Sequence, residues 1–460
     1  MFKKLLIANR GEIAVRILRA CREMDIESVA VYSAADEDAL HVQFTEEAVC
    51  IGPARAAGSY LNQDAILTVA KAAGCDALHP GYGFLSENAA FADACREAGI
   101  AFVGPSGDVI RKMGDKAAAR ALMQSVGVPV VPGSDGLVAT AEEAREIAGR
   151  IGYPVLIKAS AGGGGKGMRR VYAPDELEPL FHEAAAEAKA NFGDGSLYLE
   201  KLIVNPRHIE IQILADKFGN VVQLGERDCS IQRKNQKLLE ESPSHALPQA
   251  VRERMGEAAV KAARAAGYEN AGTVEFVLAP DGSFYFIEMN TRIQVEHPVT
   301  ELVSGVDLVQ EQIRIAAGLR LRKTQDQLRP SGHAIECRIN AEDPAHDFAP
   351  RPGRAEFFHF PGGPGVRVDS CLYNGCEISP HYDSLVAKLI VHAPTRLGAI
   401  RRMRRALEEL TMAGLTTNAA LLHQILYHPA FVRGGYTTSF LDEHLDELLD
   451  WIAKAEEAAQ

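Results

Sequence analysis

A regular alternation of strand-like and helix-like segments over residues 1–113 restricts the fold of this chain more than any other feature. Residues 3–9 have the apolar character of a strand, and residues 11–24 place Ile13, Ile17 and Leu18 on one stripe of a helix. The rhythm continues with strands expected at 27–33, 76–80 and 100–105 and helices at 65–74 and 88–99. Such alternation is typical of a parallel sheet covered by helices, so we expect an N-terminal α/β domain over residues 1–113. Because no GxGxxG follows the first strand, the pattern does not favour a dinucleotide-binding domain.

The pattern changes beyond residue 113, and a chain of 460 residues has room for about three domains. Residues 114–330 are richer in strands, which indicates a mixed α+β region. Residues 331–445 have short strands before a helix at 399–410, and residues 446–460 read as a helical or frayed tail. The core face of that helix is formed by Ile400, Met403, Leu407 and Leu410. The strands expected in these two regions are 153–160, 197–203, 207–216, 220–228, 272–278, 283–290, 333–340, 353–360 and 385–393.

Composition excludes several classes of protein. Apolar residues make up 47% and charged residues 24%, as in a soluble globular protein with a full core. The net charge of −12 argues against nucleic-acid binding, and no apolar run approaches the roughly 18 residues of a membrane span. Eight cysteines without a CxxC pair predict reduced thiols in a cytoplasm, mostly as small buried residues, rather than a disulfide framework or a zinc site.

The segment YFIEMNTRIQVEH, residues 285–297, places a dense set of polar groups directly after an aromatic run. Alternate side chains of an extended segment share one face. Five polar residues fall on one parity here and would line one surface: Glu288, Asn290, Arg292, Gln294 and Glu296.

Two glutamates in this part of the chain are expected to face each other. The strands around Glu275 and Glu288 flank Pro280-Asp281-Gly282, and Asp-Gly is a strong hairpin signal. A symmetric loop then places Glu275 opposite Glu288, with Val277 and Phe286 as apolar neighbours on the same face. Because like charges repel, such a pair needs a cation, and Mg²⁺ with Asn290 as a further oxygen ligand fits. The alternative is an edge hairpin whose glutamates point into water.

A run of glycines at 158–168, KASAGGGGKGM, follows another strand. Unhindered backbone N–H groups in such a stretch can surround an anion, and Lys158 at the strand end favours a phosphate-covering flap over a flexible hairpin tip. It is not a P-loop, because Gly167 stands where Ser or Thr is needed.

Three further segments leave two interpretations open. Glu200 and Lys201 end a strand and could read an adenine edge. His208, Glu210 and Gln212 share one strand face, as in an ordinary half-exposed strand or in a site wall. Residues 226–237 could either belong to a functional site or form a basic surface loop, and the sequence favours neither.

Taken together, several segments resemble biotin carboxylase, over nearly the whole chain from IANRGEIAVRILRA to YDSLVAKLIV. The segments that carry the resemblance are HPGYGFLSEN (79–88), MGDK (113–116), KASAGGGGKGM (158–168), EKLIVNPRHIEIQ (200–212), GERDCSIQRKNQK (225–237), FIEMNTRIQVEHPVTE (286–301) and GHAIECRINAEDP (332–344).

The resemblance implies a three-part ATP-grasp architecture: an N-terminal α/β domain at 1–113, an ATP-grasp domain at 114–330 with a lid at about 131–203, and a C-terminal biotin carboxylase domain at 331–445. It also implies that bicarbonate attacks the γ-phosphate of ATP, that the resulting carboxyphosphate gives CO₂, and that biotin captures the CO₂. By similarity, ATP would be held by Lys116, Lys158, Gly164, Gly165, Glu200, Lys201, Ile203, His208 and Asn235, together with the metal ligands Glu275 and Glu288.

The remaining roles also follow from the resemblance. Mg²⁺ or Mn²⁺ would be bound by Glu275, Glu288 and Asn290. Glu296 would deprotonate bicarbonate, and Arg338 would stabilise the biotin enolate. The expected bicarbonate and biotin contacts are Lys237, Arg292, Gln294, Val295, Arg338 and Tyr82.

The resemblance further implies partners. Because no Met-Lys-Met type attachment motif is present, biotin is expected on a separate carrier protein. Carboxyltransferase subunits of an acetyl-CoA carboxylase, or of a related acyl-CoA or pyruvate carboxylase, would take the carboxyl group, and a homodimer is typical of the family.

Two positions depart from the family pattern. Asn235 stands where His is frequent, and Ala161 replaces the first glycine of the flap. Neither departure touches an expected metal ligand, the base or Arg338, so an active enzyme is expected. The alternatives are another ATP-grasp carboxylate–amine ligase and a non-catalytic ATP-binding subunit.

Overall fold

The N-terminal part of the chain forms a five-stranded parallel sheet. The structure, a computed structural model, describes residues 1–160 and 167–459. The strand order is β3-β2-β1-β4-β5, so the chain starts in the centre of the sheet and winds outward in both directions. The predicted parallel α/β region is confirmed. The strands are β1 (Lys4–Ile7), β2 (Glu27–Tyr32), β3 (Glu47–Cys50), β4 (Ala77–His79) and β5 (Ala101–Phe102), with helices α1 (Gly11–Glu23), α3 (Gln63–Ala72) and α4 (Ala89–Glu97) between them.

The sequence prediction missed the edge strand β3 and the short helix α2 (Leu40–Phe44) before it. No residue of β3 is buried, so its composition lacks the apolar run by which the other strands were recognised.

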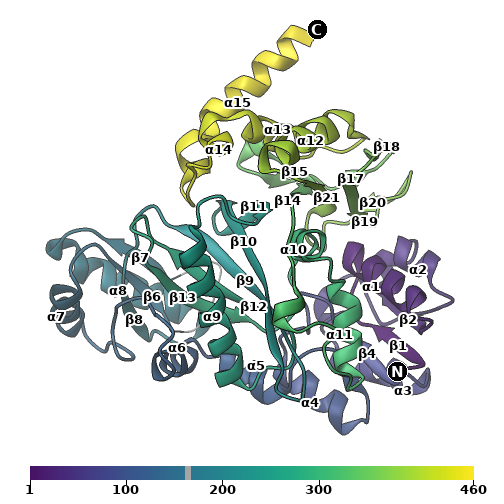
Figure 1. The fold of residues 1–460 in the computed structure, drawn as a ribbon, viewed down its shortest axis with the longest axis horizontal. Coiled ribbons are helices and arrows are strands. Elements are labelled where there is room, and N and C mark those ends of the chain that lie inside the picture. The colour runs from purple at the N-terminus through teal and green to yellow at the C-terminus, as the bar shows by residue number, and fades with distance from the viewer. Residues whose placement is uncertain (161–166, 460) are drawn as a thin grey trace.

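An eight-stranded antiparallel sheet forms the centre of the molecule, with strand order β13-β12-β9-β10-β11-β14-β21-β19 (Figure 1). Its strands are β9 (Arg207–Ala215), β10 (Val221–Arg233), β11 (Gln236–Ser242), β12 (Asn270–Leu278), β13 (Phe284–Asn290), β14 (His333–Asn340), β19 (Val366–Ser370) and β21 (Leu385–Ala393). The pairing of β11 with β14 joins Leu239 to Cys337 and Glu241 to Ile335, so one sheet continues across the expected division at residue 330. The division into domains stays a prediction.

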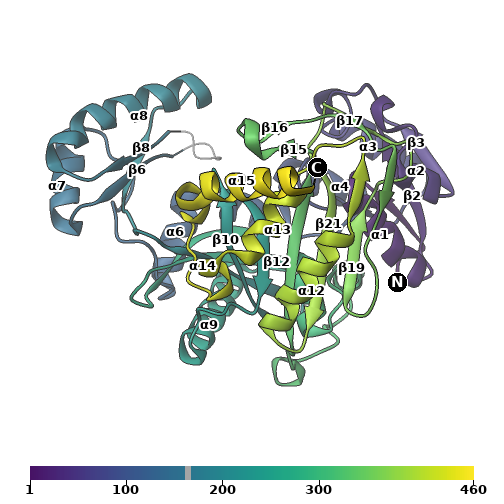
Figure 2. The same ribbon diagram turned by 90° about the horizontal axis from the view of Figure 1, so that it is seen from above.

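A smaller three-stranded sheet, β7-β6-β8, lies to one side of the large sheet, and the N-terminal part lies on the other side (Figure 2). It consists of β6 (Val155–Ala159), β7 (Met168–Val171) and β8 (Leu197–Lys201), with helices α7 (Ala141–Ile151) and α8 (Leu177–Phe192) packed against it. The glycine run between β6 and β7 falls on 161–166, outside the described residues, as do Gly164, Gly165 and Ala161.

Helices cover the large sheet. Helix α9 (Gln249–Ala266) buries an alanine-rich face against β9 and β10, and α12 (Arg396–Glu409) buries Ile400, Met403 and Leu407 against β14 and β21. The tail is helical: α15 (Phe440–Ala459) starts in the core and projects away from it (Figure 1). The other helices over residues 107–125, 297–316 and 419–432 are α5 (Gly107–Gly114), α6 (Lys116–Ser125), α10 (His297–Ser304), α11 (Leu308–Ala316), α13 (Ala419–Tyr427) and α14 (Pro429–Val432).

Two local interpretations are wrong. The segment 226–237 is not a basic surface loop, because β10 runs to Arg233 and turns back at Lys234-Asn235 into β11. Both turn residues have positive φ, 48° and 65°, as a two-residue hairpin loop requires, and Asn tolerates that conformation well. The strand expected at 353–360 divides into β17 (Gly353–Arg354) and β18 (Phe357–His359), which belong to different small sheets.

The five polar residues predicted to share one surface within 285–297 all line one cleft, described below, but they do not belong to one extended strand, because β13 ends at Asn290. Arg292, Gln294 and Glu296 lie in the turn that leads into α10, whose N-cap is Glu296.

Candidate active site

A cleft of about 1850 Å³ lies between the N-terminal part, the small sheet and the large sheet. Every sequence-predicted site residue within the described residues lines this cleft. Those residues are Tyr82, Lys116, Lys158, Glu200, Lys201, Ile203, His208, Asn235, Lys237, Glu275, Glu288, Asn290, Arg292, Gln294, Val295, Glu296 and Arg338. Gly164 and Gly165 are outside the described residues.

One end of the cleft is formed by the small sheet. Lys158 Nζ on β6 contacts Glu200 Oε2 on β8 at 2.5 Å, and Arg120 Nη1 on α6 reaches the other oxygen of Glu200 at 3.3 Å. Burial alone lowers the pKa of Lys158, but the charge of Glu200 raises it above its ordinary value, so the ammonium is retained. Lys201 Nζ donates to the carbonyls of Gly152 and Tyr153 at 3.0 and 2.7 Å. Arg120 was not predicted as a site residue, because nothing in the sequence distinguishes an arginine of an amphipathic helix that lines a site from one that lies on the surface.

The two glutamates predicted to face each other do so. Glu275 on β12 pairs with Glu288 on β13, and the prediction of this register is confirmed. Nearer the turn, a bulge shifts the pairing, so Phe286 lies opposite Phe276 and Val277 opposite Tyr285. Although β13 is the edge strand of the sheet, Glu275 is only 6% exposed and therefore does not point into water, as the alternative interpretation required. Burial, followed by the charge of Glu275, raises the pKa of Glu288.

The chemistry of this pair fits a magnesium ion. Glu275 already has cationic neighbours, because Lys237 Nζ is 3.0 Å from its Oε1 and His208 Nε2 is 3.1 Å from its Oε2. Burial alone lowers the pKa of His208, but Glu275 raises it to about 9. Glu288 and the side-chain oxygen of Asn290 supply further oxygen donors beside Glu275, which is the kind of ligand set that Mg²⁺ takes.

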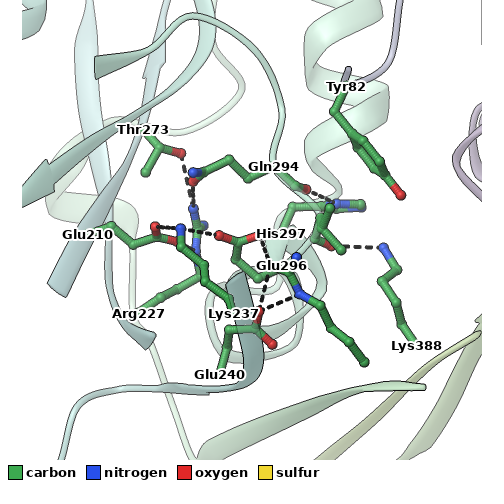
Figure 3. Close-up of polar contacts among 12 residues, drawn as sticks. Tyr82, Glu210, Arg227, Lys237, Glu240, Thr273, Gln294, Glu296, His297 and Lys388 are labelled. Atoms are coloured by element: carbon green, nitrogen blue, oxygen red, sulfur yellow. Dashed lines mark hydrogen bonds and ion pairs between the residues drawn. The ribbon is translucent and has the colours of Figure 1, made fainter. Parts of the chain in front are cut away.

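Lys237 on β11 is the charged centre of the cleft floor (Figure 3). Its Nζ contacts Glu210 Oε2 at 2.6 Å, Glu275 Oε1 at 3.0 Å and Glu296 Oε1 at 2.7 Å. Burial would lower the pKa of Lys237, but the three carboxylates raise it well above its ordinary value. One ammonium therefore joins the acidic pair to the predicted base.

Glu296 is held from its other side by Arg338 on β14. Arg338 Nη2 lies 2.8 Å from Glu296 Oε2, and Arg338 Nε donates to Glu240 Oε1 at 2.6 Å. Burial alone raises the pKa of Glu296, but Lys237 and Arg338 lower it below its ordinary value. A carboxylate that stays ionised, 2% exposed and beside an open cleft can accept a proton from a bound substrate.

Contacts from the N-terminal part fix the turn that carries Arg292 and Val295. Arg292 Nε donates to Glu87 Oε2 at 2.8 Å, and the Thr291 backbone N–H donates to Glu87 Oε1 at 3.1 Å. Glu87 lies in HPGYGFLSEN, one of the segments that carry the family resemblance, but no role was predicted for it. Lys388 Nζ on β21 donates to the Val295 carbonyl at 2.8 Å (Figure 3). Sequence reasoning missed Lys388, because its strand reads as ordinary core.

The interpretation of β9 as an ordinary half-exposed strand is wrong. Glu210 and Gln212 are fully buried, because β10 and β12 flank the strand on both sides and polar partners meet its second face.

Comparisons with known proteins cover almost the whole chain. Three family models match it: Biotin carboxylase, N-terminal domain at residues 1–110; Carbamoyl-phosphate synthase L chain, ATP binding domain at 115–324; and Biotin carboxylase C-terminal domain at 336–443. Biotin carboxylase of Nostoc sp. is 60% identical over 442 residues, 96% of this chain and 99% of that protein. Biotin carboxylase 1 of Bacillus subtilis is 56% identical over 96% of this chain and 99% of that protein.

Solved structures agree. Biotin carboxylase from Campylobacter jejuni has a TM-score of 0.93 at 48% identity and covers 96% of this chain and 99% of that one. The biotin carboxylase domain of the Hydrogenobacter thermophilus 2-oxoglutarate carboxylase has a TM-score of 0.92 at 54% identity, with 96% and 98% coverage. The resemblance, the fold class and the enzymatic nature predicted from the sequence are confirmed, and the chain belongs to the biotin carboxylase family of ATP-dependent ligases.

Proposed function

We propose that this enzyme carboxylates biotin carried on a separate protein, using ATP and bicarbonate, as the first half-reaction of a biotin-dependent carboxylase. The observation that carries the proposal is the position of Glu296. This ionised carboxylate is held between Lys237 and Arg338, and the same Lys237 contacts Glu275 of the paired glutamates. Lys158 lies in the same cleft, at the end formed by the small sheet. A base and a phosphate-binding region thus share one cavity.

ATP occupies the part of the cleft lined by α6, β6 and β8. Lys158 exchanges its contact with Glu200 for a phosphate oxygen, and Arg120 remains to balance Glu200. Further nucleotide contacts come from Lys116, Lys201, Ile203, His208 and Asn235, with Gly164 and Gly165 from the glycine run over the phosphates. Mg²⁺ or Mn²⁺, held by Glu275, Glu288 and Asn290, would neutralise phosphate charge, which phosphoryl transfer requires more than covalent help.

Bicarbonate binds at the floor of the cleft, between the side chains of Lys237, Arg292 and Gln294 and the Val295 backbone. Glu296 removes its proton, and the bicarbonate oxygen then attacks the γ-phosphorus of ATP, so that ADP leaves and carboxyphosphate forms. Carboxyphosphate breaks down to CO₂ and phosphate, the released phosphate takes the N–H proton of a biotin ureido nitrogen, and that nitrogen then bonds to the CO₂. Arg338 stabilises the negative charge on the ureido oxygen, since a guanidinium does not lose its proton, and Tyr82 faces the biotin side of the cleft.

The setting of the reaction follows by similarity. Biotin arrives on a biotin carboxyl carrier protein, and carboxyltransferase subunits consume the product. We propose a homodimer, because the Hydrogenobacter thermophilus relative is described as a dimer bound to MgADP and bicarbonate. All eight cysteines are free thiols, which supports a reducing cytoplasm. Among the described residues, no helix has both the length and the apolar character to cross a membrane. Residues 1–113, 114–330 and 331–445 act as the N-terminal, ATP-grasp and C-terminal parts.

The test is ADP release by the purified protein with MgATP, with and without bicarbonate and free biotin. We expect ADP formation that requires bicarbonate, rises with biotin, and falls by about 10²–10⁴-fold in Glu296→Gln, the range for loss of a general base. Glu253→Gln, an exposed glutamate on α9, is the matched control and should retain wild-type activity.

Two outcomes contradict the proposal. ATP turnover that does not need bicarbonate would favour another ATP-grasp ligase. Nucleotide binding without turnover under any condition would favour a non-catalytic subunit.

A further inference from the structure

Arg227 on β10 lies directly beneath the floor of the cleft without being part of it. Its side chain is 0% exposed and is not part of the cleft lining. Figure 3 shows Arg227 beside Glu210, Thr273 and Gln294. All three of its nitrogens donate hydrogen bonds. The acceptors are Glu210 Oε1, bonded to Nε; Gln212 Oε1 at 2.6 Å and Thr300 Oγ1 at 3.0 Å, bonded to Nη1; and Thr273 Oγ1 at 3.0 Å and Gln294 Oε1 at 2.7 Å, bonded to Nη2.

These acceptors use the full donor capacity of a guanidinium, which has five N–H groups in a rigid fork. They come from β9, β12, α10 and the turn before α10. A buried charge is costly unless it is paired and hydrogen-bonded. A guanidinium whose five N–H groups all have acceptors therefore indicates that Arg227 has a specific structural role.

The first consequence concerns the amide of Gln294. Arg227 has no acceptor atom, so the Gln294 atom that faces it must be the carbonyl oxygen. The amide nitrogen is then turned the other way, where it donates to Glu275 Oε1 at 2.8 Å. Arg227 from one side and Glu275 from the other therefore hold the amide of Gln294, a residue of the cleft lining, in one orientation, with its N–H groups turned away from Arg227.

The second consequence concerns Glu210. Its Oε1 is taken by Arg227, which leaves Oε2 for Lys237 Nζ at 2.6 Å. Lys237 in turn contacts Glu296 Oε1 at 2.7 Å. The chain Arg227–Glu210–Lys237–Glu296 fixes the ammonium and the base relative to one another, and only the last two of these side chains line the cleft.

We propose that Arg227 is the positioning residue of the bicarbonate site, which orients the Gln294 amide and the Glu210–Lys237 pair through one guanidinium. This inference rests on the proposed function, because it takes bicarbonate as the anion bound there. Arg227 touches no substrate. Its effect is on the geometry of groups that do.

The test is steady-state ADP formation by Arg227→Lys with bicarbonate and ATP varied in turn. A lysine keeps the charge but offers its donors from one point, so it cannot reach Glu210 and Gln294 together. We expect the KM for bicarbonate to rise by about tenfold, the scale of one lost charge-assisted hydrogen bond, while the KM for ATP stays within about twofold. Thr273→Val, which removes one acceptor and keeps the shape of the side chain, should raise the bicarbonate KM by about threefold.

Arg396→Lys is the matched control. Arg396 is also a largely buried arginine, bound to Glu241 and to the carbonyls of Phe431 and Val432, outside the cleft. It should lower the melting temperature without changing the bicarbonate KM. If Arg227→Lys does not fold, Thr273→Val decides.

A wild-type bicarbonate KM in every folded variant overturns the inference, and so does an equal rise in both KM values. Absence of bicarbonate-dependent ADP formation in the wild type would instead overturn the proposed function.

Discussion

Arg338 and Glu296 form a direct ion pair, with Nη2 and Oε2 2.8 Å apart, although 42 residues separate them in the sequence. Arg338 comes from β14 and Glu296 from the N-cap of α10, and Glu240 binds the same guanidinium at 2.6 Å. The proposed base and the proposed enolate stabiliser thus balance each other's charge before any substrate arrives. When Glu296 takes a proton, Arg338 loses one of its two anionic partners and can attract a new negative charge.

Arg338→Lys should separate the two chemical stages. Glu296 keeps a cationic neighbour, so bicarbonate-dependent ADP formation should stay within about tenfold of wild type, whereas stimulation by biotin should disappear, because an ammonium cannot hold two carboxylates and an enolate oxygen in one plane. The measurement is the rate of ADP release with and without biotin. Retained biotin stimulation would remove Arg338 from the biotin step.

Glu288→Gln should uncouple the protein from its metal. The change removes the repulsion from Glu275, so the melting temperature without Mg²⁺ should be unchanged or higher. The shift that MgADP produces should fall to less than about half of the wild-type shift, because a ligand stabilises only the state it binds. The measurement is the melting temperature of wild type and Glu288→Gln with and without MgADP. A lower melting temperature without Mg²⁺, together with a full MgADP shift, would contradict the assignment of this pair as metal ligands.

Glu241 should make stability depend on acid pH. This buried carboxylate accepts from His333 at 2.6 Å and from Arg396 at 2.7 Å. Burial alone raises its pKa, but these two partners lower it to about 2. A folded-state pKa below the unfolded value gives stability that is complete above about pH 4.5 and is lost as the pH falls toward 2. The difference in melting temperature between wild type and Glu241→Gln should therefore be constant from pH 7 to 5 and shrink below pH 4.5. A difference that stays constant down to pH 3 would refute this account.

The end of α15 should be dispensable, whereas its middle should not. Leu448 is fully buried, and Trp451 and Ile452 pack against the same core, while residues 453–458 are exposed. A stop after Ile452 should leave the melting temperature and activity unchanged. A stop after His444 should lower the melting temperature strongly, since each large apolar side chain loses about 1.5–3 kcal/mol of burial. Equal melting temperatures for the two truncations would show that this helix does not stabilise the core.

Contacts between residues that are close in the sequence could be predicted, whereas contacts between residues that are far apart in the sequence could not. The alternation of side chains along a strand and one hairpin signal placed Glu275 opposite Glu288. Both are properties of a short stretch of sequence, so this pair could be predicted. The bulge beside that pair was not predictable, since a bulge depends on packing that the hairpin alone does not contain. The contact between Lys237 and Glu296 joins positions 59 residues apart, and it became expected only through the resemblance.

Arg227 shows what a closer reading could have found. It stands with Glu226 and Asp228 in the middle of β10, between Leu224 and Ile231, and charged residues inside a strand are buried only when they are paired. That signal was available. The partners of Arg227 could not be predicted, because they come from two other strands, one helix and one turn.

The pairing of β11 with β14 has a consequence for anyone who dissects this protein. The family models end at residue 324 and resume at 336, which suggests a place to cut. A cut there would separate β14 from β11, one of its two neighbours, and leave an open edge of unpaired N–H and C=O groups along Ala334–Cys337, the kind of edge that recruits other chains into aggregates. The C-terminal third should therefore precipitate when expressed alone, and regain solubility only when β11 is supplied.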